Sequence, residues 1–189
     1  MAPLTDGEFT ELYREHYAAV LRFVRRRARP DAVDDVVAET FVAAWQRQDE
    51  FRRYPLPWLY RTARNMMLNA ARSENRRTAL AVRVRGEFDD ADPTDVAGTV
   101  GFRRDLVSAW HRLTGSEQEV LALAIWEQLP GAEAAVVLGL TRAGYTMRLS
   151  RARRRLAAYL DVERADPRAT DPPPTTIAAA APLTSLDRK

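Results

Sequence analysis

Arginine is the only charged residue type between positions 142 and 160, and it recurs there six times. Like charges at helical spacing repel one another, so a helix of this composition is stabilised when a polyanion lies against it. Planar guanidinium groups pair with phosphates and with the edge of guanine. The segment therefore predicts contact with nucleic acid, while the plainer alternative is a solvated basic face.

The residues in front of this segment form a helix-turn-helix pattern. A short helix is expected over 131–138, Gly139 and Leu140 make a tight turn, and Thr141 caps the basic helix. The apolar residues of the basic helix share one face and are Tyr145, Leu149, Ala152, Leu156 and Tyr159. That face should pack on the rest of the domain and leave arginines outside, as in helices that enter the major groove of DNA.

A second basic helix is expected from about Trp58 to Ser73. Asn65 and Asn69 lie one turn apart on it, and amides at this spacing can contact base edges. The arginines of this helix are Arg61, Arg64 and Arg72, and aromatic residues that could stack on unpaired bases occur at Phe51, Tyr54, Trp58 and Tyr60. Core packing is an alternative role for the aromatics, and for Trp58 it is at least as good an explanation.

Three carboxylates, those of Asp34, Asp35 and Glu39, could hold Mg²⁺ in a metal-dependent nuclease. The sequence offers little to complete such a site, because His16 and His111 are the only histidines and there is no cysteine. The positive end of a helix accounts for the two aspartates, and binding to basic groups of a partner accounts for Glu39. We therefore expect no catalytic residue, no metal site, no cofactor and no enzymatic activity.

Helical periodicity divides the 189 residues into two parts. We expect an all-α fold of two small helical domains, residues 8–77 and 104–160, joined by a flexible acidic linker at 78–103. Residues 161–189 are rich in proline, alanine and threonine and are predicted to form a disordered tail.

Local signals set the expected helix ends. The first helix should end in a run of arginines before Pro30, which suits the negative end of a helix dipole. Asp31 is expected to cap the next helix. In the second domain, Ser116 is expected to cap a buried helix, and Glu119 three residues later should complete a capping box.

The sequence also indicates where the protein works. No apolar run approaches the roughly 20 residues that span a bilayer. Residues 1–10 contain two acids and lack the basic start of a signal peptide. The absence of cysteine fits a reducing compartment. We expect a cytoplasmic protein with no membrane insertion.

Four segments resemble conserved regions of sigma-70-type factors, which direct RNA polymerase to promoters. Residues Asp34–Trp45 resemble region 2.2, Pro55–Asn65 resemble regions 2.3 and 2.4, and Leu113–Leu121 with Arg148–Arg153 resemble region 4. Regions 1.1 and 3 have no counterpart, which is the pattern of the extracytoplasmic-function group. The resemblance implies that residues 8–77 bind core polymerase and recognise and melt the −10 element, and that residues 104–160 recognise the −35 element.

The resemblance also implies site residues and partners. Contacts to the clamp of the largest polymerase subunit are implied for Asp35, Val36, Glu39 and Thr40. The −10 positions are Phe51, Arg52, Arg53, Tyr54, Asn65 and Asn69, and Trp58, Arg61 and Arg72 join them from the same basic helix. At the −35 element, Thr146, Met147, Ser150 and Arg151 are implied to face bases, with Arg142 and Arg154 near phosphates. The polymerase flap, promoter DNA and an anti-sigma factor are further expected partners.

Other functions fit part of the sequence. A stand-alone helix-turn-helix transcriptional regulator that binds duplex DNA would explain residues 141–160, but not the acidic helix, aromatic loop and asparagine pair of the first domain. A degenerate sigma-like protein that only binds a partner is another alternative.

Overall fold

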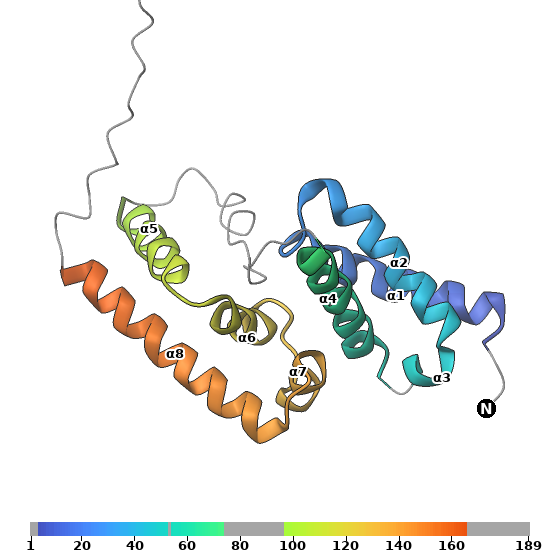
Figure 1. Cartoon of the computed structure of the whole chain (residues 1–189). Helices are drawn as coiled ribbons and strands as arrows, with labels where there is room; N and C mark the ends of the chain where they lie inside the picture. The colour runs from blue at the N-terminus through green and yellow to red at the C-terminus, as the bar shows by residue number, and fades with distance from the viewer. Residues whose placement is uncertain (1–3, 53, 74–96, 166–189) are drawn as a thin grey trace, which may run out of the picture.

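The computed structural model describes residues 4–52, 54–73 and 97–165, and all regular elements in these ranges are helical. The all-α prediction is therefore confirmed. The first half contains α1 (Asp6–Arg25), a 3₁₀ turn (Pro30–Ala32), α2 (Val33–Gln46), α3 (Gln48–Phe51) and α4 (Pro55–Ser73). The second half contains α5 (Ala97–His111), α6 (Gly115–Ile125), α7 (Gly131–Leu138) and α8 (Arg142–Ala165) (Figure 1).

The helix caps differ from two of the predictions. Thr114, not Ser116, caps α6, because its extended backbone brings its hydroxyl to the amide of Glu117 (3.4 Å), and Glu117 closes the capping box. Asp31 does not cap α2 and instead binds Arg29, with a shortest N–O distance of 2.7 Å. Glu119 is thereby left free of capping and reaches across to the first half of the chain.

Two helices extend beyond their predicted limits. Helix α5 begins at Ala97, inside the segment expected to be a linker, and α8 continues to Ala165, inside the expected tail. Extending an existing helix costs little, and the added residues at the end of α8 include the good helix formers Glu163, Arg164 and Ala165. The rest of the predicted linker and tail, 74–96 and 166–189, lies outside the described residues.

The two halves share one apolar core, which the sequence did not predict. Phe23 of α1 and Tyr60 of α4 stack with ring centroids 4.3 Å apart. The same cluster of buried residues includes Val120 and Leu123 of α6 and Val137 of α7. Helix α7 packs on α4, so the second half lies directly against the first (Figure 1).

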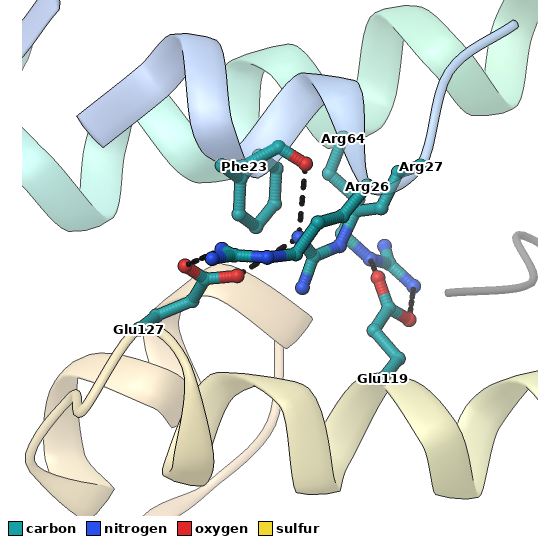
Figure 2. A network of polar contacts seen from close by, with 6 residues as sticks. All are labelled: Phe23, Arg26, Arg27, Arg64, Glu119 and Glu127. Carbon is teal, nitrogen blue, oxygen red and sulfur yellow. Dashed lines mark hydrogen bonds and ion pairs between the residues drawn. The ribbon is translucent and has the colours of Figure 1, made fainter. Parts of the chain in front are cut away.

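A charged contact is buried in this interface. Glu127, just after α6, accepts hydrogen bonds from Arg26 Nη1 (3.0 Å) and Arg27 Nη1 (2.9 Å) at the end of α1 (Figure 2). The side chains of Arg27 and Glu127 are 0% and 3% exposed. Arg27 also donates to the carbonyl of Phe23 (3.0 Å) and lies over the ring of that residue. Burial lowers the pKa of Arg27, while the charge of Glu127 opposes this shift.

No helix in the described ranges combines the length and the apolar character that crossing a membrane requires.

The Glu127→Gln substitution should destabilise the protein by about 3 kcal/mol, because it leaves a buried guanidinium without a counter-charge. Urea unfolding of the purified protein measures this change. The control is Glu11→Gln, whose pair with Arg14 is 75% and 69% exposed and should matter by less than about 1 kcal/mol. Equal stability of the two variants would show that the buried pair contributes no more than a surface pair.

Tyr60 makes the fold sensitive to alkali. Burial, with a smaller effect from Glu127, raises its pKa from 10.0 to about 12. The unfolded chain therefore loses this proton first as the pH rises, so the stabilisation is complete below pH 10 and is lost toward pH 12. The loss of stability between about pH 10 and pH 11.5 should be smaller by about 1.5 kcal/mol in Tyr60→Phe than in the wild type, as measured by urea unfolding. An identical loss in both proteins would contradict the role of Tyr60.

Candidate nucleic-acid interface

The buried face of α8 fixes how the helix is rotated in the domain. Tyr145 is 2% exposed and its hydroxyl donates to the carbonyl of Val120 (3.3 Å), while Ala152 is fully buried two turns later. The turn before α8 places Gly139 in the left-handed region (φ +66°), and the Thr141 hydroxyl accepts from the amide of Gly144 (3.0 Å). The predicted turn, cap and packing face are confirmed.

The opposite face of α8 brings the six predicted −35 residues together. They are exposed, and with Ala143 they line one shallow depression along the helix: Arg142, Thr146, Met147, Ser150, Arg151 and Arg154. Met147 is 53% exposed, so most of this apolar side chain is accessible to a ligand. The face therefore offers guanidinium groups, hydroxyls and one apolar side chain to a ligand.

The side chains of Arg155 and Thr146 on α8 already make contacts within the protein. Arg155 binds Glu117 at the start of α6 (2.7 Å), so it ties α8 to its own domain. Thr146 donates its hydroxyl to the carbonyl of Arg142 (3.0 Å), which leaves the oxygen lone pairs to accept from a ligand.

Helix α4 presents a second exposed strip. Arg61, Asn65 and Asn69 are exposed and lie at four-residue intervals, while Leu59 and Ala63 on the opposite face are fully buried. The structure thus places these three predicted −10 residues side by side along one helix. Arg72 belongs to the same helix, but its side chain and the whole of Arg53 lie outside the described residues.

The aromatic residues near α4 are not equally available to a base. Phe51 is fully buried at the end of α3 and meets Trp58 edge to face, with centroids 5.9 Å apart. Its predicted contact with a base does not fit this structure, because the ring fills the core. Trp58 is half-buried and donates to Glu50 (3.4 Å), whereas Tyr54 is 50% exposed. Arg52, also predicted to contact DNA, is partly exposed.

The predicted polymerase-binding residues of α2 divide into two pairs. Asp35 and Glu39 are exposed. Val36 is 8% exposed and Thr40 is fully buried, with its hydroxyl donating to the carbonyl of Val36 (2.6 Å). Thr40 also contacts Met66 Sδ of α4 (3.6 Å). The prediction that Val36 and Thr40 contact a partner directly does not fit this burial, because Val36 belongs to the apolar core and Thr40 contacts α4.

Two apolar residues beside the acidic pair were missed. Val42 and Trp45 are 54% and 41% exposed. Trp45 meets Phe9 of α1 edge to face at 4.9 Å, so one side of its ring is covered. The signal was present in the sequence, since Val42 lies seven residues after Asp35 and shares its helix face.

The described residues contain no group of three potential ligands arranged to hold a metal ion. Asp34, Asp35 and Glu39 are all exposed on α2. The nuclease alternative therefore has no metal site among the residues that prompted it.

Substitutions on the two faces of α8 should differ widely in their effect on stability. Tyr145→Ala should cost about 3–5 kcal/mol, because it empties a fully packed site. Met147→Ala should change the free energy of unfolding by no more than about 0.5 kcal/mol, because the side chain is mostly in solvent. Thermal or urea unfolding tests both. A large loss with Met147→Ala would mean that this face is covered in the folded protein.

Comparisons with known proteins agree with this geometry. Residues 12–77 match the family Sigma-70 region 2. The chain is 32% identical over 162 residues to the RNA polymerase sigma factor NccH of Alcaligenes xylosoxydans xylosoxydans, covering 80% of this chain and 86% of that protein. It is 32% identical over 168 residues to the RNA polymerase sigma factor CnrH of Cupriavidus metallidurans, covering 82% and 87%.

Solved structures show the same fold. CnrH in complex with the cytosolic domain of CnrY is similar with a TM-score of 0.57 and 29% identity, over 84% of this chain and 90% of that one. A further relative is the ECF RNA polymerase sigma factor SigL of Mycobacterium tuberculosis, 27% identical over 153 residues, covering 79% of this chain and 86% of that protein. With helices, exposed basic faces and relatives in agreement, the chain belongs to the sigma-70 family of RNA polymerase sigma factors, in its extracytoplasmic-function group.

Proposed function

We propose that this sigma factor reads the −35 element with the outer face of α8 and the −10 element with the outer strip of α4. The observation that carries the proposal is the gathering of six predicted DNA-contacting residues on one exposed face of α8. Tyr145 and Ala152 hold that face outward from the opposite side of the helix. Family membership favours this function over a stand-alone regulator.

Each residue type on α8 has a matching partner in duplex DNA. The guanidinium of Arg151 can pair with two acceptors of guanine, and Met147 can pack on the methyl group of thymine. Arg142 and Arg154, toward the ends of the depression, would bind phosphates and set the register of the helix on the duplex. Specificity at the −35 element then depends on the central residues and affinity on the outer ones.

The strip on α4 suits single-stranded DNA better than duplex DNA. Amides of Asn65 and Asn69 can bond to the edges of bases that have left the stack, and Arg61 can bind phosphate. The half-exposed ring of Tyr54 lies before the start of α4, where an unpaired base could stack on it. Flipping a base costs a few kcal/mol. Two DNA-binding modules held on one polymerase gain overall affinity through effective concentration, which helps to offset that cost.

Docking on polymerase would use the acidic pair and the apolar residues of α2. Asp35 and Glu39 can bind basic groups of the clamp, and the exposed Val42 and Trp45 add apolar contact beside them. Residues 104–160 would be held near the flap. Because polymerase and chromosome share the cytoplasm, we place the protein there, as a transcription initiation factor with no catalytic step of its own.

A protein partner would regulate the sigma factor. CnrH, which is 29% identical in the solved structure, forms a complex with the cytosolic domain of CnrY. We propose that an anti-sigma protein holds this chain in a comparable complex and releases it when transcription is required.

Transcription with purified core RNA polymerase and a promoter library tests the proposal. Start sites should share −10 and −35 motifs. Arg151→Ala should weaken promoter use by about 1–3 kcal/mol, or roughly 5- to 150-fold, and relax the preference at one −35 position. Asn65→Ala should relax the preference within the −10 element.

The matched control is Arg153→Ala, which removes the same side chain from an exposed position of α8 outside the depression. It should leave the motif unchanged. Absence of polymerase binding, together with tight binding of the free protein to duplex DNA, would contradict the sigma role.

A further inference from the structure

The two halves of the chain are joined by a second charged contact, between Arg64 of α4 and Glu119 of α6 (Figure 2). The guanidinium donates from Nε to Oε1 (2.6 Å) and from Nη2 to Oε2 (3.0 Å). Two parallel hydrogen bonds between charged groups make this the strongest geometry available to an arginine. The side chains are 20% and 6% exposed, so the pair lies at the edge of the interface.

Arg64 belongs to the helix that carries the proposed −10 strip. It directly precedes Asn65 and lies three residues after Arg61, close to one helical turn. An arginine fork that binds a carboxylate side-on can bind a phosphate in the same way. A DNA strand that followed Arg61 and Asn65 would therefore pass within reach of Arg64, if Glu119 did not occupy it.

We propose that the carboxylate of Glu119 holds Arg64 in the place of a DNA phosphate, so that closure of the two halves and binding of the −10 strand compete for one guanidinium. This inference rests on the proposed reading of the −10 element by α4. It adds Arg64 to the DNA-binding residues. In the closed chain, Glu119 of the second half then inhibits DNA binding by occupying Arg64, and this inhibition is called the brake below.

The two charged contacts between the halves differ in how accessible they are to DNA. Arg27 and Glu127 are buried and therefore beyond the direct reach of DNA, so their pair stabilises the closed arrangement without competing for a phosphate. Arg64 keeps one-fifth of its side chain in solvent. Arg64 is therefore more accessible to a phosphate than Arg26 or Arg27, whose side chains are 12% and 0% exposed.

The salt dependence of single-strand binding tests the proposal in the full chain. The probe is a fluorescein-labelled DNA single strand of mixed sequence, with affinity followed by anisotropy at several salt concentrations. Glu119→Gln should bind about tenfold more tightly, because it frees one charge-assisted contact. Its slope of log affinity against log salt should steepen by about 0.7, the value for one added phosphate contact on a single strand.

Two further variants separate a phosphate contact from simple loosening of the fold. Arg64→Gln breaks the same ion pair from the other side, so it should loosen the interface equally, yet gain no affinity. Arg64→Gln combined with Glu119→Gln should lose the gain of the single Glu119→Gln variant. Glu117→Gln is the matched control, because it removes an ion pair of α6 with Arg155 inside one half and should bind like the wild type.

Closure itself can be followed because the chain contains no cysteine. Ala18→Cys on α1 and Ala157→Cys on α8 are exposed positions for a donor and an acceptor dye. Saturating single strand should lower energy transfer in the wild type, as the halves separate to release Arg64. The same concentration of a neutral peptide nucleic acid should not, because it carries no phosphate.

An unchanged salt slope in Glu119→Gln, alongside promoter-directed transcription by the wild type, would overturn the brake and leave the sigma role intact. The brake would also be overturned if Arg64→Gln gained as much affinity as Glu119→Gln, since the gain would then come from loosening. Absence of both single-strand binding and promoter-directed transcription would remove the proposed function, and this inference with it.

Discussion

A buried guanidinium decides how the two halves of this sigma factor meet. Arg27 has no exposed side-chain surface, and an isolated charge in that position would cost several kcal/mol. Glu127 lies a hundred residues further along the chain and supplies the compensating charge. Apolar burial alone favours contact without specifying an orientation. The ion pair adds direction, because only one placement of the loop after α6 brings the carboxylate to the end of α1.

The surrounding contacts depend on that placement. Gln128, next to Glu127, has φ at +49°, a conformation that costs energy for a residue with a side chain and that turns the chain toward α7. Trp126 packs edge to face on Trp110 of α5 at 5.0 Å and lies under Arg26. The loop thus links the ion pair to the core of the second half. With the halves so oriented, α4 and α6 come close enough for Arg64 and Glu119 to pair.

Sequence patterns predicted what depends on neighbours along the chain. The cap at Thr141, the turn at Gly139 and the buried face of α8 follow from residues within a few turns, and all were confirmed. The ion pairs could not be found in this way. Both Thr114 with Glu117 and Ser116 with Glu119 match a capping box, so sequence could not show which glutamate remains free to cross the interface. Arg27 had a sufficient local explanation at a helix C-terminus, which concealed its distant partner.

Residue roles inferred from family resemblance describe a protein bound to polymerase and DNA, whereas the structure describes the chain by itself. The difference matters most at Phe51. Full burial of a phenylalanine stabilises a fold by about 1.5–3 kcal/mol, and stacking on one base contributes about 1–3 kcal/mol. Moving Phe51 from the core to a base would exchange one contribution for another of the same size. Tyr54 is 50% exposed already, so a base can stack on its ring without bringing a fully buried side chain out of the core. Energetically, the proposed capture of an unpaired base is therefore better assigned to Tyr54 than to Phe51.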